Sequence, residues 1–268
     1  METATQLDLL TSKPERGIAV LTLNRASARN ALSLGMLHKL HVAIDTLGSD
    51  PDVSAIVLTN EGPVFSSGHD LKELTAHRAD ADKGHAFFET TMRACSAMMQ
   101  AIVLSPRPVI AAVNGTATAA GCQLVATCDL AVASERSTFM TPGVNIGLFC
   151  STPMVALSRN VPRKRAMEML LLGEALGAND AAAYGLVNRV VAPDKVLAEA
   201  MTMARTIASK SHKTIAIGKE AFYRQVEQPL TEAYHYATGV MVQNMMAADA
   251  EEGICAFIEK RVPKWEKP

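Results

Sequence analysis

Two short stretches of the chain could each present backbone N–H groups to a ligand. The first, PVIAAVNGTATAAGCQLVATCD at 108–129, joins a β-branched run to a helical segment through small residues. Such a strand-to-helix turn leaves N–H groups without backbone partners at the start of the helix. Because Ala119, Ala120 and Gly121 carry almost no side chain, a ligand could approach this backbone closely. Simple close packing would also explain the small residues.

The second stretch, FSSGHDLKEL at 65–74, follows an apolar run at 55–59 in the same way. Asp70 is expected to cap the helix that follows, with Glu73 in its first turn. Two such turns could direct two N–H groups at one oxygen atom. That arrangement is an oxyanion hole, in which loss of one donor costs about 3–4 kcal/mol of transition-state stabilisation.

Composition limits the class of protein. The 268 residues are 49 % hydrophobic but only 4 % aromatic, so the core is expected to be aliphatic. The net charge is −1, which provides no general attraction for nucleic acid or an anionic membrane. No apolar run reaches the length of a membrane span. We therefore expect neither nucleic acid nor membrane as a partner.

The cysteines and the N-terminus indicate a reducing compartment. The five cysteines are odd in number and form no CxxC motif, which argues against disulfides and a zinc site. The N-terminal METATQLDLLTSKPER has neither a signal-peptide core nor an Arg-rich transit pattern. The predicted location is the cytoplasm, or the mitochondrial matrix if a transit peptide was removed.

Strands and helices are predicted to alternate up to about residue 192. Strands are expected at 7–10, 18–23, 54–59, 109–113, 130–133, 137–140 and 187–191, and helices at 34–47, 86–104, 152–159, 163–172 and 179–185. The charged segment 75–86 is expected to be exposed and mobile. From Asp194 the pattern is helical, with breaks near Ser211, Pro229 and Asp249.

This helical tail is more apolar than solvent exposure would favour. Its apolar residues include Val240, Met241, Met245, Met246, Ile254, Phe257 and Ile258. Part of the tail is therefore expected to pack on another subunit.

Six motifs, in order along the chain, make the sequence resemble the enoyl-CoA hydratase/isomerase (crotonase) superfamily, most closely its enoyl-CoA hydratase domain-containing protein 3 branch. They are LNRASARNAL (23–32), FSSGHDLKEL (65–74), PVIAAVNGTATAAGCQLVATCDLAVAS (108–134), FMTPGVNIGLF (139–149), AMEMLLLGEALGANDAAAYGLVNRVV (166–191) and EGICAFIEKR (252–261).

The resemblance implies an α/β fold in two regions. Residues 1–192 would form a crotonase-type spiral of ββα units with an acyl-CoA pocket, and residues 193–268 a C-terminal all-helical trimerisation region. Homotrimers, often paired into hexamers, are implied as the assembly. The substrate would be a coenzyme A thioester, with no separate cofactor and no metal.

In relatives, one backbone N–H from each turn holds the thioester carbonyl, and the matching residues here are His69 and Ala120. Arg25 and Lys72 match cations near the CoA phosphates. Phe257 and Lys260 match a pair that reaches the nucleotide, in some members from a neighbouring subunit. The implied substrate-binding residues are Arg25, Ser67, Gly68, His69, Asp70, Leu71, Lys72, Ala120, Phe257 and Lys260.

The chain departs from the family at the two glutamates that hold the water in hydratases. The matching residues are Gln123 and Gly143, which complete the candidate catalytic set with His69 and Ala120. Neither side chain exchanges a proton at neutral pH. Each missing acid or base is typically worth about 10²–10⁴-fold in rate. Classical hydration is therefore expected to be weak or absent.

Three further interpretations remain open. The chain could bind acyl-CoA without catalysis, or Cys150 could act as the nucleophile of a thioester hydrolase. The side chain of His69 titrates near neutrality and could protonate an enolate, as in decarboxylating relatives with His in this loop. Asp129, which ends the segment 108–129, is expected to be structural.

Overall fold

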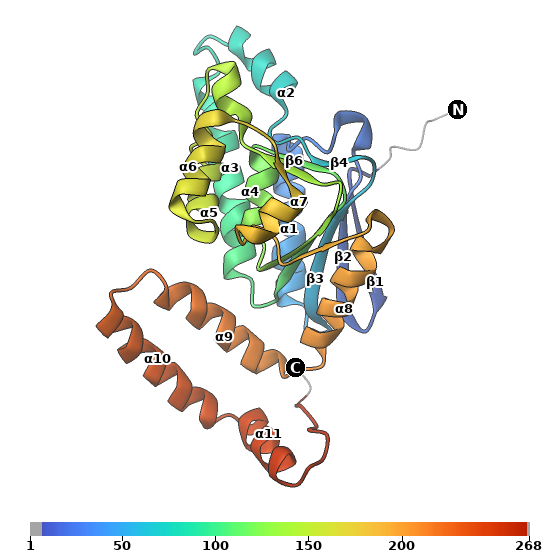
Figure 1. The fold of residues 1–268 in the computed structure, drawn as a ribbon, viewed down its shortest axis with the longest axis vertical. Coiled ribbons are helices and arrows are strands. Elements are labelled where there is room, and N and C mark those ends of the chain that lie inside the picture. The colour runs from blue at the N-terminus through green and yellow to red at the C-terminus, as the bar shows by residue number, and fades with distance from the viewer. Residues whose placement is uncertain (1–6, 267–268) are drawn as a thin grey trace.

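A six-stranded sheet carries most of the core in the computed structural model, which describes residues 7–266 (Figure 1). Its strand order is β1-β2-β3-β5-β7-β10. The hairpin β1–β2 is antiparallel, and the other neighbouring strands are parallel. The strands are β1 (Leu9–Glu15), β2 (Gly17–Leu23), β3 (Val53–Asn60), β5 (Val109–Val113), β7 (Leu130–Ser134) and β10 (Arg189–Val191).

A second sheet of short strands lies beside the first and leads into the candidate site. Its order is β4 (Val64–Ser66), β6 (Thr116–Thr118), β8 (Thr138–Met140) and β9 (Leu176–Gly177). Three strands of the large sheet are each followed by a short strand and then by helical structure: β3–β4–α2, β5–β6–α4 and β7–β8 with the 3₁₀ helix Pro142–Ile146. The predicted spiral of ββα units is therefore confirmed.

One face of the large sheet is covered by the helices of the body, among them α1 and α3. Ser33 caps α1, the helix predicted at 34–47, since its Oγ accepts a hydrogen bond from Met36 N at 3.2 Å. The inner face of α1 carries Leu37, Leu40 and Ile44, which are completely buried. The helices are α1 (Leu34–Ser49), α2 (Leu71–Ala76), α3 (His85–Leu104), α4 (Ala120–Thr127), α5 (Pro153–Asn160), α6 (Arg163–Leu172) and α7 (Ala178–Ala183).

Helix α8 (Val196–Ala208) covers the opposite face of the large sheet. Ala200, Met201 and Ala204 are buried there in one cluster with Val20 and Val57. The division at residue 192 stays a prediction, but α8 packs with the spiral body rather than with the helices that follow it.

Helices α9 (His212–Gln225), α10 (Leu230–Met245) and α11 (Ala248–Ile258) project from the body as an arm (Figure 1). A buried ion pair fixes α9 to the body: Lys219 Nζ lies 2.7 Å from Asp129 Oδ2 and also donates to the carbonyls of Ile102 and Arg107. The hydroxyl of Tyr223 donates to Asp129 Oδ1 at 2.9 Å. Asp129 is thus structural, as predicted.

The structure lengthens the first predicted strand, whereas segment 75–86 is largely exposed as predicted. Strand β1 continues to Glu15, five residues beyond the strand predicted at 7–10, and the chain turns before Gly17, whose φ is +79°. Segment 75–86 holds the end of α2 and a 3₁₀ turn, and the rings of His77 and Phe87 stack at 3.6 Å between centroids. Within the described part of the chain, no helix has the length and apolarity to cross a membrane.

Candidate active site

The two small-residue turns lie directly against each other. Strands β4 and β6 pair in parallel, with Val64 opposite Thr116 and Ser66 opposite Ala117. A methyl group on Gly68 would lie 3.1 Å from Ala120 N, and one on Gly121 would lie 2.3 Å from the carbonyl oxygen of Ser66. The turns can therefore approach this closely only because both positions are glycine.

The first turn is held by hydrogen bonds that leave one N–H free. Leu32 N donates to Gly68 O at 2.8 Å, and Asp70 N donates to Leu32 O at 3.4 Å. His69 lies between these two bonded positions, opposite Leu32. The backbone nitrogen of His69 makes no hydrogen bond to the described residues.

The second turn has a strained backbone just before α4. Ala119 has φ +51° and ψ −116°, a conformation that costs a residue with a Cβ about 1–3 kcal/mol. Its N–H is fixed to Met140 O at 2.9 Å. Ala120 then begins α4, where the first N–H groups have no partner inside the helix. Within residues 7–266 the backbone nitrogen of Ala120 is unpaired.

The side chain of His69 is a neutral imidazole at pH 7. Burial lowers its pKa below the ordinary value for histidine. Neither ring nitrogen makes a hydrogen bond of good geometry to the described residues, although the nearby Leu32 backbone partly offsets this lowering of the pKa. A neutral imidazole accepts a proton more readily than it gives one, so this side chain is better suited to be a base than the acid expected from the sequence.

Gln123 places an unpaired amide on the first turn of α4. It lies three residues after Ala120, and residues at this spacing share one helix face. The residue is only 5 % exposed. Its Oε1 atom is buried and has no hydrogen-bond partner in the part of the chain described.

Gly143 lies where no side chain would fit without rearrangement. It follows β8 in the 3₁₀ helix Pro142–Ile146. A Cβ at this position would lie 2.8 Å from Leu148 O and 2.9 Å from Cys150 Sγ. Cys150 is itself buried, which raises the pKa of its thiol. The space beside Gly143 is therefore occupied by the loop that contains Cys150.

The predicted CoA-binding cations differ in how free they are. Arg25 Nη1 donates to Asp70 Oδ2 at 3.0 Å, so this guanidinium is already paired. Asp70 caps α2 as predicted, accepting from the backbone of Lys72 and Glu73. Burial alone would raise the pKa of Asp70, but hydrogen bonds from Glu73 N and Arg25 lower it. Lys72 is exposed beside this cap, as is Leu71, whereas Ser67 is half-buried.

Phe257 and Lys260 are not near the two turns within one chain. They lie at the end of α11, which is at the far end of the molecule from α2 (Figure 1). Phe257 is 85 % exposed. Any contact of these residues with a ligand at the turns would have to come from another copy of the chain.

Asn30 is a positioning residue that the sequence analysis did not identify. It is fully buried, and its Oδ1 accepts a hydrogen bond from Arg25 N at 2.8 Å. The Asn30 Nδ2 atom donates to the carbonyls of Glu61 and Val64. The backbone carbonyl of Asn30 accepts a hydrogen bond from Ser66 Oγ. It therefore fixes β4 beside Arg25. An Asn in a polar turn, where it tolerates its φ of +50°, was the available signal.

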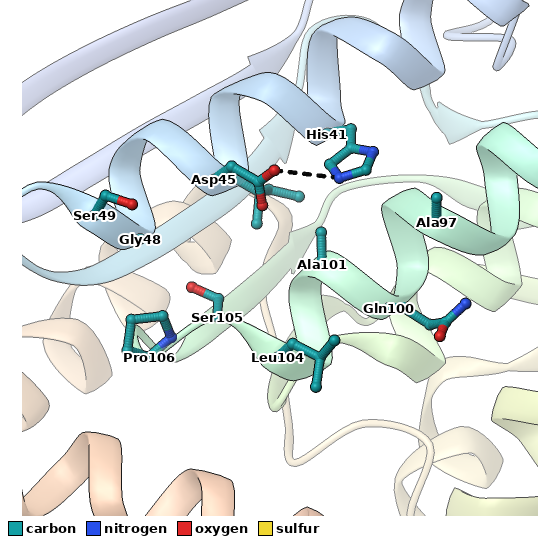
Figure 2. A pocket seen from close by; sticks show the side chains of 11 residues that line it. His41, Asp45, Gly48, Ser49, Ala97, Gln100, Ala101, Leu104, Ser105 and Pro106 are labelled. Carbon is teal, nitrogen blue, oxygen red and sulfur yellow. Dashed lines mark ion pairs between the residues drawn. The ribbon is translucent and has the colours of Figure 1, made fainter.

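A cavity of about 590 Å³ lies elsewhere, between α1 and α3 (Figure 2). His41 and Asp45 face one side of it, and Gln100 and Leu104 the other. It contains none of the predicted site residues, and neither does a second cavity of about 380 Å³ beside α6. We place the candidate site at the turns because the backbone nitrogens of His69 and Ala120 are unpaired there within residues 7–266.

The contact between the turns predicts a strong effect of a single methyl group. Gly121→Ala should lower the free energy of unfolding by about 1–3 kcal/mol or more, because its Cβ would overlap backbone at Ser66. The matched control is Gly218→Ala in α9, where nothing lies within 4 Å and about 0.5–1 kcal/mol of stabilisation is expected. Urea denaturation measures both; equal stabilities would contradict this packing.

The lowered pKa of His69 predicts a pH effect on stability. The unfolded chain takes up a proton near the ordinary histidine pKa, whereas the native state does so only at lower pH. His69 therefore destabilises the native state as the pH falls through that window. As the pH falls from 7.5 to 5.5, the natural protein should lose stability relative to His69→Gln. The difference in the free energy of unfolding, variant minus natural protein, should therefore rise. A pH-independent difference in urea denaturation would contradict the buried, neutral imidazole.

Comparison with known proteins shows the family of the chain. The Enoyl-CoA hydratase/isomerase family model matches residues 13–268. A Mus musculus protein, "Enoyl-CoA hydratase domain-containing protein 3, mitochondrial", is 49 % identical over 96 % of this chain and 84 % of its own length. The Homo sapiens protein of the same name is also 49 % identical, over 93 % of this chain and 80 % of its own length.

Solved structures agree in fold as well. A crystal structure of enoyl-CoA hydratase from Mycobacterium smegmatis is 50 % identical, with a TM-score of 0.92 over 97 % of this chain and 99 % of that one. The crystal structure of human enoyl Coenzyme A hydratase domain-containing protein 3 is 47 % identical, also with a TM-score of 0.92, over 97 % and 100 % of the two chains. With a fold and turns that match its motifs, this chain belongs to the enoyl-CoA hydratase/isomerase family.

Proposed function

We propose that this protein binds an acyl-CoA thioester with its carbonyl oxygen between the backbone nitrogens of His69 and Ala120. The observation that carries the proposal is the contact between two turns that each leave one N–H unpaired. Donors on rigid backbone need little reorganisation when negative charge develops on the oxygen. The α4 N-terminus adds a favourable dipole there. The site would therefore stabilise a thioester enolate.

Local cations would hold the CoA phosphates. Lys72 is exposed beside the first turn, and Arg25 is fixed by Asp70 on the same side. The net charge of −1 supplies no general attraction, so these two groups carry the electrostatic part of binding. Phe257 and Lys260 would reach the nucleotide end only from a second copy.

The proposed site has little capacity for hydration. Gln123 can orient a water molecule but cannot deprotonate it. Gly143 contributes no side chain, and the carbonyl of Leu148 and the thiol of Cys150 occupy the adjoining space. Any hydration would be slow, with the neutral His69 imidazole as the remaining base. A non-catalytic acyl-CoA-binding protein is the second candidate, favoured by the loss of both carboxylates.

Two observations weigh against a thioester hydrolase that uses Cys150. Burial raises the pKa of this thiol, which reduces the thiolate fraction at neutral pH. No hydrogen bond joins its sulfur to a histidine anywhere in residues 7–266.

The names of the vertebrate relatives contain the word mitochondrial. Of the two predicted locations, this favours the mitochondrial matrix over the cytoplasm.

Restoring one carboxylate tests the role of Gln123 in chemistry. The natural protein should hydrate crotonyl-CoA slowly or not at all, and Gln123→Glu should raise the rate by about 10²-fold or more, because it supplies a general base. Adding Gly143→Glu should give little further gain, since the loop at Leu148 and Cys150 blocks that side chain. Loss of the conjugated absorbance of crotonyl-CoA measures the rate.

Two controls accompany this experiment. Gln100→Glu makes the same chemical change on the exposed face of α3 and should leave the rate unchanged. His69→Ala reports what the imidazole contributes to any residual turnover. Fast hydration by the natural protein would show that Gln123 and Gly143 do not limit catalysis. Failure to bind any CoA ester in calorimetry would reject the proposed function.

We also propose that the arm forms a homotrimer, or a hexamer of two trimers. Its exposed apolar residues are Leu230, Tyr234, Met241, Val242, Met245, Met246, Ile254, Phe257 and Ile258. An apolar surface of this extent is typical of a subunit interface. A second copy would also complete the site, because Phe257 and Lys260 are far from the turns of their own chain.

Charges on the arm should disrupt this assembly. The double variant Met245→Asp and Phe257→Asp is expected to be monomeric, because both side chains are more than half exposed and would be buried in the interface. Val42→Asp, on α1 of the body, is the control for a charge on an exposed apolar residue. Light scattering after size-exclusion chromatography gives the mass; an unchanged mass for the double variant would contradict the interface.

A further inference from the structure

We infer that the groove between α1 and α3 is a second binding site, which takes an aliphatic compound with a primary ammonium group. This groove is the cavity of about 590 Å³ drawn in Figure 2, and none of the residues of the proposed acyl-CoA site line it. The inference is therefore independent of the proposed function. The volume of the groove lies within the range of about 300–1,000 Å³ that is usual for small-molecule sites.

The first observation is an apolar floor between two helices that run side by side. Their C-terminal ends meet, because a methyl group on Gly48 of α1 would lie 3.0 Å from Oγ of Ser105, which follows α3. Ile44 lines the groove from α1, and Ala97 and Ala101 line it from α3. Because alanines stand at two successive turns of α3, a hydrocarbon chain has room between the helices.

The second observation is one permanent charge on the wall of the groove. Asp45 is the only Asp, Glu, Lys or Arg among the lining residues. Its Oδ2 lies 3.2 Å from Nε2 of His41, one turn earlier on α1, and this pair is dashed in Figure 2. Its Oδ1 has no partner among the described residues, and the side chain is 62 % exposed. A cationic ligand could therefore reach this carboxylate.

The third observation is that the other free polar atoms at the groove include several acceptors. Gln100 donates from Nε2 to Ser96, and its Oε1 accepts no hydrogen bond within residues 7–266. The last carbonyls of the two helices, at Ser49 and Leu104, are likewise unpaired in that range. Neither helix has a basic residue in its last turn. The negative ends of both helix dipoles therefore meet at one end of the groove.

Two cations of the protein lie near this end, and both are held by other groups. Lys219 donates to Ile102 O and pairs with Asp129. Arg107 donates from Nη2 to Asp50 O at 3.2 Å. Neither side chain lines the groove, so Asp45 has no cation of the protein beside it there other than His41 when that imidazole is protonated.

These properties select the chemistry of the ligand. An ammonium group has three donors and no acceptor, which suits a carboxylate and an amide oxygen. A carboxylic acid would be repelled by Asp45. A bound metal ion fits less well, because the described residues contain no group of three or more His, Cys, Asp or Glu side chains that could hold one. The alkyl chain of the ligand would lie on the apolar floor.

Titration of three probes of one chain length, followed by ligand-observed NMR, tests the inference. The probes are hexylammonium, hexanol and hexanoate, at low ionic strength because salt screens an exposed ion pair. Hexylammonium should bind the natural protein about fivefold more tightly than hexanol, the upper range for a pair of this exposure, and hexanoate should bind most weakly. Butylammonium should bind more weakly than hexylammonium, since it covers less of the floor.

Two variants then assign the preference to one carboxylate. Asp45→Asn keeps the shape of the side chain and removes its charge, so it should bind hexylammonium and hexanol with equal affinity. Urea denaturation checks that this exposed substitution leaves the fold intact. Glu174→Gln is the control, because Glu174 is exposed, has no partner among the described residues and does not line the groove. It should retain the fivefold preference.

Each result either supports the inference or overturns it. A preference for hexylammonium that is lost in Asp45→Asn and kept in Glu174→Gln supports it. Equal affinity of the natural protein for hexylammonium and hexanol would overturn it, and so would the binding of none of the probes. A preference that persists in Asp45→Asn would also overturn it, because the ammonium would then bind elsewhere.

Discussion

The site depends on a contact between two backbone turns that only glycine permits. Gly68 and Gly121 face the opposite turn at distances where a methyl group would overlap a carbonyl or amide. This contact places the backbone nitrogen of Ala120, the first residue of α4, close to Gly68, the residue before His69. The chemistry of such a site survives changes in side chains as long as the two glycines remain. Ala120 is an example, because its contribution is its backbone.

The rest of the spiral body holds that contact in place. Strands β4 and β6 are three residues long and would not be stable alone, but each continues from a long buried strand of the large sheet. Asn30 adds hydrogen bonds on one side, and Met140 O fixes the strained Ala119 on the other. The positive φ of Ala119 persists because these neighbours determine the path of the chain. Rigidity at the turns therefore comes from the packing of both sheets.

Periodicity and turn chemistry predicted the long elements but not the short strands of the second sheet. The apolar spacing of Leu37, Leu40 and Ile44, with Ser33 as cap, locates α1 well. By contrast, residues 116–118 have no alternation long enough to distinguish a strand from a turn, and they form a strand through pairing with β4 and β8. The packing of Cys150 against Gly143 is likewise a tertiary contact that leaves no local pattern. The candidate site residues were predicted from the order of the motifs, whereas the residues that contact them in the structure were not predicted.

The two departures from the hydratase pattern differ in physical character. At Gln123 an amide replaces a carboxylate of nearly the same shape, so the side chain keeps its hydrogen-bonding capacity and loses only its proton exchange. At Gly143 the side chain is absent and the loop with Cys150 occupies the adjoining space, since a hypothetical Cβ would lie 2.9 Å from Cys150 Sγ. The first change alters what the site does to a ligand, whereas the second alters its shape. Positions 123 and 143 together therefore carry one buried acceptor, the Oε1 atom of Gln123, and no carboxylate.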